Sequence, residues 1–314
     1  MIRRKAILGA GLVAMPAAAV LAAGLLGSAP AARGAQAPGP AAATVAVGPQ
    51  YDTAHVYVAP DMVATFASSW EATFGGTSTT PKVTDVTPTP SETISELLLS
   101  PVGTLSVFGY TTPAPYPFGQ ERGGDLVTSF SAGVAAATRS GALLVVSPWN
   151  DPIGKDAIVQ FPGGVDQQVY WHTSPPSYPP LATIPESRVY LEPPAAAAFI
   201  RDYLAFSHGH VTLDNPRADG GQIGLPGTTF REVAISSAFG KTLVIISDGQ
   251  LPYPFGLEST GYAVPSLTAT LAKATAAGAK ILWGPYRSAT ADTAMLQFPG
   301  GYIAEVHQAG SRGN

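Results

Sequence analysis

Two ionisable side chains of this sequence stand in apolar surroundings. Glu305 lies between Ala304 and Val306 in a mostly apolar stretch, and His55 lies in the alternating stretch Ala-His-Val-Tyr-Val at 54–58. A carboxylate is costly to bury unless it is paired or bound to a metal, and imidazole both carries protons and binds metals. Both residues are therefore candidates for a functional site. The alternatives are an exposed edge position for Glu305 and an ordinary hydrogen-bonded strand position for His55.

The composition removes several other kinds of chemistry. The chain has no Cys, which excludes thiol catalysis and thiolate metal sites. We find no phosphate-binding loop, no Gly-x-Gly-x-x-Gly strand-to-helix signature and no nucleophile elbow. A formal net charge of −4 without a cluster of Lys or Arg argues against a nucleic acid as partner.

The stretch that contains Glu305 belongs to an internal repeat. Three motifs recur with one offset of 137 residues: Gln-Phe-Pro-Gly-Gly at 160–164 and 297–301, Tyr-Pro-Phe-Gly at 116–119 and 253–256, and Gly-Ala at 141–142 and 278–279. A shared offset of this kind indicates a duplicated module. The Gly-Gly pairs predict hairpin turns, and we interpret the Tyr-Pro-Phe-Gly loops as rigid structural loops rather than substrate contacts.

Periodicity predicts the elements that position these residues. In the first module a helix at 60–72 carries an apolar stripe of Met62, Phe66 and Trp70 after the opening strand. A second helix is expected at 131–140, and strands are expected at 81–86, 93–99, 103–110, 124–130, 142–147, 157–161 and 167–171. In the second module, the sequence pattern predicts helices at 193–206 and 266–277. It predicts strands at 188–191, 210–213, 230–236, 242–247, 260–264, 280–283, 294–298 and 302–307. Each module thus contains two β-α-β-β-β halves.

The chain divides into six predicted segments. They are an export signal at 1–35, a flexible leader at 36–50, a first module at 51–172, a Pro-rich linker at 173–186, a second module at 187–308 and a tail at 309–314. The signal is predicted because Arg3-Arg4-Lys5 precede an uncharged run and then small residues. A retained membrane anchor is the alternative. Cleavage would give a secreted protein without membrane attachment, and more acidic, because 1–35 contains Lys and Arg but no Asp or Glu.

With these features the chain resembles the vicinal oxygen chelate superfamily, which includes glyoxalases, bleomycin-resistance proteins and dioxygenases. The resemblance covers residues 54–307. It rests on the opening strand with His55, on the run at 261–279 and on the closing hairpin from Phe298 to Glu305. It implies an α+β fold, in which tandem βαβββ modules form curled mixed sheets around cup-shaped sites.

The resemblance also implies a divalent metal, Zn, Ni, Mn or Fe, held by His55 of the first module and by Glu258 and Glu305 of the second. Glu305 or Glu258 would then act catalytically by carrying a proton. The family position of the middle ligand falls on Ser259, one residue after Glu258. A shift of one residue turns a strand side chain to the opposite face, so Glu258 needs a bulge or the preceding loop to reach the site.

The complementary combination implies a degenerate site. It would contain Arg188, Glu121 and Gln168, where a cation and an amide replace two of the family ligands. An ion pair between Arg188 and Glu121 is expected there. His307 is expected to lie past the cup, in solvent.

These features support two functions. The favoured one is a secreted, glyoxalase-like protein that binds a small organic molecule in a cup between modules, with metal-dependent lyase or isomerase chemistry on vicinal oxygens. The alternative is a metal-free protein that binds or sequesters a small molecule, as bleomycin-resistance proteins do, and the acidic charge would suit a cationic ligand. An extradiol dioxygenase is disfavoured because the sequence offers one suitably placed His. Since both modules lie in one chain, a monomer could build the complete site.

Overall fold

The chain folds as four successive β-α-β-β-β repeats. The computed structural model describes residues 48–256, 258–288 and 290–309. Repeat 1 contains β1 (Ala54–Tyr57), the 3-10 turn η1 (Pro60–Met62), α1 (Val63–Phe74), β2 (Thr77–Ser78), β3 (Lys82–Thr84), β4 (Thr93–Ser100) and β5 (Gly103–Tyr110). Repeat 2 contains β6 (Gly124–Leu126), α2 (Phe130–Arg139), β7 (Leu143–Asn150), β8 (Gly154–Phe161) and β9 (Val165–His172).

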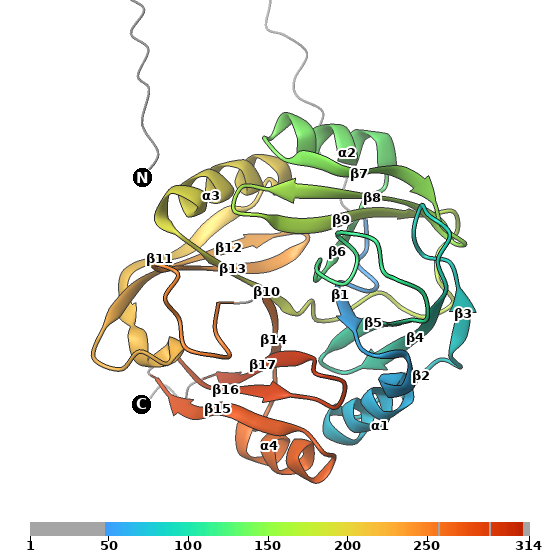
Figure 1. Cartoon of the computed structure of the whole chain (residues 1–314). Coiled ribbons are helices and arrows are strands. Elements are labelled where there is room, and N and C mark those ends of the chain that lie inside the picture. Colours follow the sequence, from blue (N-terminus) through green and yellow to red (C-terminus); the bar gives the residue numbers. More distant parts are fainter. Residues whose placement is uncertain (1–47, 257, 289, 310–314) are drawn as a thin grey trace, which may run out of the picture. The chain divides into compact units, whose positions relative to one another are not determined.

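The second module has the same order of elements. Repeat 3 contains β10 (Glu186–Leu191), α3 (Pro193–Ser207), β11 (His210–Asp219), the 3-10 turn η2 (Gly220–Ile223), β12 (Thr229–Ser237) and β13 (Gly240–Ile246). Repeat 4 contains β14 (Ser259–Ala263), α4 (Leu267–Ala276), β15 (Lys280–Arg287), β16 (Ala291–Gln297) and β17 (Ile303–Ala309). The predicted α+β class with tandem βαβββ modules and curled mixed sheets is confirmed (Figure 1).

Alternation along the strands separates an inner face from a helix-covered face. In β1, Ala54 and Val56 are fully buried in a core beneath the helices, which turns His55 and Tyr57 to the other face. In β17, Ala304 and Val306 are buried in that same core, so Glu305 also points to the other face. The inner faces of repeats 1 and 2 form what we call the first cup, and those of repeats 3 and 4 form the second cup.

The two cups are built from differently connected sheets. Repeats 3 and 4 share one eight-stranded sheet in the order β11-β12-β13-β10-β14-β17-β16-β15. Repeats 1 and 2 form separate sheets, in the orders β1-β5-β4-β2 and β6-β9-β8-β7, and β3 also pairs with β4. The second cup therefore has a continuous wall, whereas the first has a seam between β1 and β6.

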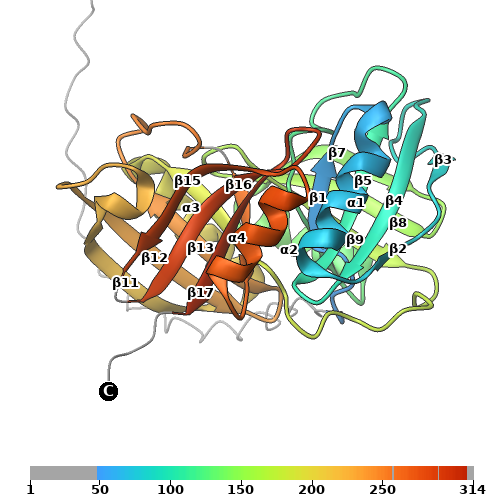
Figure 2. The same cartoon turned by 90° about the horizontal axis from the view of Figure 1, so that it is seen from below.

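The hydrophobic cores join repeats of different modules. One core unites repeat 1 with repeat 4, and there Trp70 of α1 lies 4.9 Å from Tyr262 and 5.0 Å from Phe298, measured between ring centroids. The other core unites repeat 2 with repeat 3 through contacts such as Phe161 with Phe199. Figure 2 shows α1 and α4 side by side over the first of these cores. The modules are thus linked through their helices.

The structure also bears on the predicted segments. β9 ends at His172, the last residue of the predicted first module, and β10 begins one residue earlier than the predicted second module. The Gly-Gly pairs at 163–164 and 300–301 lie in hairpins and all have positive φ, as turns of this kind require. The predicted export signal, most of the leader (residues 36–47) and most of the tail (310–314) lie outside the described residues. Within the described residues, no helix is both long and apolar enough to cross a membrane.

Candidate functional site

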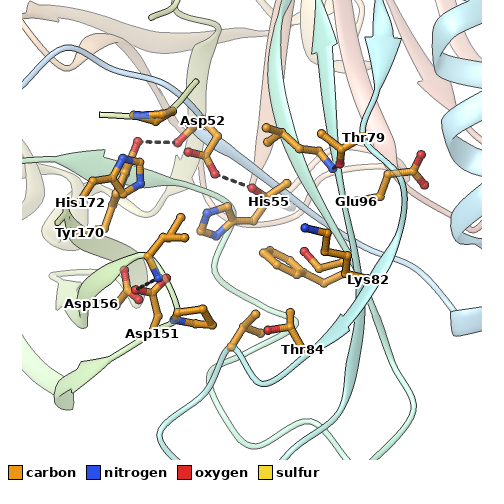
Figure 3. Close-up of a pocket in the computed structure, with 18 of the residues that line it drawn as sticks. Asp52, His55, Thr79, Lys82, Thr84, Glu96, Asp151, Asp156, Tyr170 and His172 are labelled. Atoms are coloured by element: carbon orange, nitrogen blue, oxygen red, sulfur yellow. Dashed lines mark hydrogen bonds between the residues drawn. The ribbon is translucent and has the colours of Figure 1, made fainter. Parts of the chain in front are cut away.

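The first cup encloses a cavity of about 630 Å³. Figure 3 shows His55 among side chains that come from both sheets of the first module. The seam between β1 and β6 lies beside His55, whose backbone N–H donates to the carbonyl of Arg122 at 3.1 Å. A cavity of this size suits a ligand of the dimensions of a drug molecule.

A buried histidine–carboxylate pair lies in the wall of the first cup. Nδ1 of His55 lies 2.8 Å from Oε1 of Glu121, and the two side chains are 4% and 1% exposed. The hydroxyl of Tyr57 donates to the same carboxylate oxygen. Burial alone would lower the pKa of His55, but the hydrogen bond and charge of Glu121 outweigh it, and the pKa is raised. Among the described residues Nε2 of His55 has no hydrogen-bond partner, so this nitrogen is available to a ligand.

A second carboxyl group lies across the cup on β8. Nε2 of Gln168 on β9 donates to Oδ1 of Asp156 at 2.8 Å. Burial raises the pKa of Asp156 to about 8, and the neighbouring Asp151 contributes to the rise. The charges of Asp156 and Asp52 also act on His55. The polar groups of this cup therefore interact with one another.

Aromatic rings cover the wall of the first cup that β1 and β5 form. The ring centroid of Tyr57 lies 5.4 Å from that of Phe108 and 6.2 Å from that of Tyr110. All three residues are half-buried and line the cavity. The first cup thus combines carboxyl groups with an aromatic surface.

The second cup is filled by its own side chains. A cluster of buried apolar residues from β10 to β16 and the connecting loops occupies it, with Leu243, Ile245 and Met295 among its members. Register shows how the cups differ, because His55 pairs with Ser106 on the neighbouring strand, whereas Arg188 pairs with Leu243. A serine on that strand leaves space where a leucine fills it.

The polar network of the second cup is an ion pair. NH1 of Arg188 lies 2.9 Å from Oε2 of Glu305, and Nδ1 of His307 lies 2.8 Å from the same oxygen. Thr293 donates to the other carboxylate oxygen. Burial alone would raise the pKa of Glu305, but Arg188 and His307 outweigh it and the pKa is lowered. Glu305 is thus a buried carboxylate neutralised by the protein's own cations.

The structure does not bring the predicted metal ligands together, and that set is corrected. His55 faces the first cup, whereas Glu305 faces the second. The reason lies in strand pairing: β1 pairs with β5 of its own module, and β10 joins β17 through β14. Each site is therefore built within one module and not between modules.

Glu258 lies at neither centre. It precedes β14 and lines a small cavity of about 40 Å³ together with residues of both modules, among them Asp125 and Asp166. Burial raises the pKa of Glu258 to about 8, with a further rise from Asp166. Burial likewise raises the pKa of Asp125 to about 8. No bulge or loop turns Glu258 toward His55. The one-residue shift from the family position at Ser259 therefore keeps Glu258 out of the predicted site.

Two further expectations are corrected by the same pairing. Arg188 bonds to Glu305 and Glu186, not to Glu121, because Glu121 belongs to the first cup. His307 does not point away into solvent, since its ring contacts Glu305. The Tyr-Pro-Phe-Gly loops make equivalent contacts in both modules: Gln160 donates to the Tyr116 hydroxyl at 3.2 Å, and Gln297 donates to the Tyr253 hydroxyl at 3.3 Å. Their recurrence in an open and a filled cup supports a structural role.

The residues present do not fit a divalent metal. Among the residues that the structure describes, no three His, Asp or Glu side chains are grouped where they could hold one. In the second cup a guanidinium contacts Glu305. A fixed cation beside the carboxylate disfavours a second cation. The predicted metal site is therefore not formed by the described residues.

Sequence reasoning missed the carboxyl groups of Asp52, Asp151 and Asp156 in the first cup. Asp156 lies on the same face of β8 as Ile158 and Gln160, which follow it by two and four residues. This period of two could have placed Asp156 on the inner face. Asp52 lies just before β1 and accepts a hydrogen bond from Ser106, a contact between distant segments that no local pattern indicates.

Comparisons with known proteins add a fold relationship. No protein-family model and no curated protein sequence matches the chain. Among solved structures, a mutant 4-hydroxymandelate synthase from Streptomyces coelicolor is 15% identical over 85% of this chain and 94% of its own, with a TM-score of 0.59. The Mn(II)-bound glyoxalase from Novosphingobium aromaticivorans is 12% identical over 84% and 83%, with a TM-score of 0.51. Homoprotocatechuate 2,3-dioxygenase from Arthrobacter globiformis is 14% identical over 86% and 82%, also at 0.51.

Proposed function

Because this chain has the vicinal oxygen chelate fold of glyoxalases and dioxygenases, with one open and one filled cup, we propose that it binds a small organic molecule in the first cup. The observation that carries the proposal is the cavity of about 630 Å³ lined by both polar and aromatic side chains. Binding rests on hydrogen bonds from the polar groups around His55 and on contact with the rings of Tyr57 and Phe108. The proposal needs no metal, because no three His, Asp or Glu side chains of the described residues are grouped where they could hold one.

The test is to fill the first cup as the second cup is filled. Ser106→Leu places on β5 the side chain that Leu243 supplies at the matching position of β13. A panel of small molecules is screened by thermal shift, because a ligand of the folded state raises the melting temperature. We expect stabilising compounds for the unaltered protein and none for Ser106→Leu.

The matched control is Ser68→Leu, the same change on the exposed face of α1. This variant should keep the response to every compound. If the ligands still stabilise Ser106→Leu as they do Ser68→Leu, they bind elsewhere and the proposal is wrong. Elemental analysis of the purified protein tests the second part, and about one tightly held divalent metal per chain would contradict metal-free binding.

The His55–Glu121 pair favours a second function, metal-free proton transfer on a bound carbonyl compound. Glu121 holds Nδ1, which leaves Nε2 of His55 as a general base within the cup. Incubation of α-hydroxyketones in deuterium oxide would reveal exchange of the carbon-bound proton. Exchange should disappear in His55→Gln and shift its pH profile in Glu121→Gln, and exchange that persists in His55→Gln would contradict this function.

Export remains a prediction, based on the signal at residues 1–35. The monomeric state also remains a prediction. The culture medium of a producing cell should contain a chain that begins after residue 35, which mass spectrometry of the intact protein would show. Light scattering of that protein would give its mass in solution.

A further inference from the structure

Carboxyl groups outnumber Lys and Arg around the first cup. Four acidic side chains of the cavity lining face its interior: Asp52, Glu121, Asp151 and Asp156. Among the described residues that line it, Lys82 is the one Lys or Arg, and it is exposed. Figure 3 shows Lys82 on the opposite side of His55 from Asp151 and Asp156. The acidic side of the cup has no basic side chain of its own apart from histidine.

Two of these carboxyl groups lack the partners that burial normally requires. Oε2 of Glu121 is buried without a hydrogen-bond partner among the described residues, and this side chain is 1% exposed. Asp156 is 5% exposed, and the hydrogen bond that it receives comes from the neutral amide of Gln168. A buried carboxylate without a strong counter-charge is costly. Glu121 has the weak base His55 at one oxygen and Asp156 has a neutral amide, so both are suited to an external cation.

In the second cup, a cation of the protein itself pairs with the buried carboxylate. There the buried carboxylate of Glu305 is neutralised by Arg188, at the position on β10 that His55 occupies on β1. The first cup has the weaker base His55 at this position and an open cavity beside it. An external cation would stand where the guanidinium stands in the other module.

We propose that the ligand of the first cup is an organic cation, with an ammonium group held by Asp156 and Glu121 and an apolar body laid against Tyr57 and Phe108. This inference rests on the proposed function, since it names the chemical class of the same ligand. Rings at these positions also attract a cation through their electron-rich faces. The half-buried Tyr110 extends that surface.

The cup should release a proton when it takes up the cation. Without ligand, burial and Asp151 raise the pKa of Asp156 to about 8, so this group is largely protonated at neutral pH. The groups that face it are Asp151 on its own hairpin, Gln168 on β9, and His55 and Asp52 on the β1 side. As the pH rises through about 8, Asp156 loses its proton and the cup becomes more negative. Affinity for a cation should therefore rise with pH.

Three indole compounds of similar size differ in charge and so test its contribution to binding. They are tryptamine, which is a cation, tryptophol, which is neutral, and indoleacetate, which is an anion. Isothermal titration near pH 8 should show tryptamine binding on the order of tenfold more tightly than tryptophol, and indoleacetate most weakly. Titration in buffers of different ionisation enthalpy should show proton release with tryptamine and none with tryptophol.

Asp156→Asn and Glu121→Gln remove a negative charge at nearly constant shape. We expect each to reduce the preference for tryptamine over tryptophol to about twofold, with tryptophol binding little changed. The matched control is Asp125→Asn, which removes another buried carboxyl group outside the first cup and should keep the full preference.

The outcomes separate this inference from the proposed function. If tryptophol or indoleacetate binds as tightly as tryptamine, or if Asp156→Asn and Glu121→Gln both keep the preference, the cation assignment is wrong and binding in the cup still stands. If none of the three probes binds while other compounds of the thermal-shift panel do, the assignment is also wrong. If no compound binds at all, both proposals fail.

Discussion

At the scale of single residues, the contact between Arg188 and Glu305 is the one in the second cup whose loss should most reduce the free energy of unfolding. Replacing Arg188 by Leu leaves Glu305, which is 2% exposed, without its main counter-charge. Breaking a buried pair in this way destabilises a protein by about 3 kcal/mol or more. Urea unfolding at neutral pH should show a loss of that order in the free energy of unfolding.

The loss should depend on pH in a defined direction. The pKa of Glu305 is lowered in the folded protein, so the stability that the pair provides is present above the unfolded value near 4.5 and is lost as the pH falls. In Arg188→Leu, burial without the nearby guanidinium should raise the pKa of Glu305, so this carboxylate becomes protonated as the pH falls. The difference in the free energy of unfolding between the variant and the unaltered protein should therefore shrink from neutral pH toward about pH 5. Arg231→Leu is the control, because Arg231 and Asp214 are 47% and 45% exposed and such pairs contribute below about 1 kcal/mol. Equal losses in both variants would contradict this account.

The site residues differ in how far the sequence could predict them. His55 and Glu305 stand out because a polar residue in an apolar alternating stretch is visible locally. Their partners could not be predicted from that pattern, since Glu121 reaches His55 over 66 positions and Arg188 reaches Glu305 through an intervening strand. The family resemblance suggested a site shared between modules. Because β10 pairs with β14 of its own module, Glu305 instead meets Arg188 of that module.

At the scale of elements, the β16–β17 hairpin links the fold of one module to the other. Gly300 and Gly301 both have positive φ, but a Cβ on Gly300 would lie 2.6 Å from Val58, whereas a Cβ on Gly301 would meet open space. Alanine costs about 1–2 kcal/mol at either position because of the backbone conformation. Gly300→Ala should cost about 1 kcal/mol more, because Val58 must also move.

Urea unfolding of the two variants side by side provides the measurement, with each variant serving as the other's control. A second comparison is Gly163→Ala with Gly164→Ala, where a Cβ on Gly163 would lie 2.4 Å from Leu191 and one on Gly164 would meet nothing. The same order of costs is expected there. If Gly301→Ala proves as costly as Gly300→Ala, the contact with Val58 does not matter.

The secondary structure could be predicted well because its signals are local. The helix at 60–72 is found as η1 followed by α1 to Phe74, and Gly75 follows it. The short strand β2 was missed, since two residues show no periodicity. β6 is shorter than the strand predicted at 124–130, because α2 already begins at Phe130.

At the scale of the whole molecule, the shared cores predict that the two modules unfold together. Trp70 is fully buried and contacts Tyr262 and Phe298 of the other module. Trp70→Ala should lower the free energy of unfolding by about 3–5 kcal/mol. Because the core belongs to both modules, unfolding should remain one transition by circular dichroism and by fluorescence of the other tryptophans.

Leu144→Ala is the control, since Leu144 lies on β7 and is 42% exposed. Its effect should stay within about 0.5 kcal/mol. Two separate transitions in Trp70→Ala, with one module unfolding before the other, would contradict the shared core.

The pairing of the first repeat with the fourth, and of the second with the third, sets an order of events during synthesis. Repeat 2 can meet its partner soon after repeat 3 leaves the ribosome, because the two are neighbours in sequence. The apolar stripe of α1 must wait for β14 to β17 at the far end of the chain. Contacts between such distant segments form slowly, so a nascent chain exposes Phe66 and Trp70 until repeat 4 has been made. The first cup, with one wall in each core, is therefore completed only when the last repeat has been made.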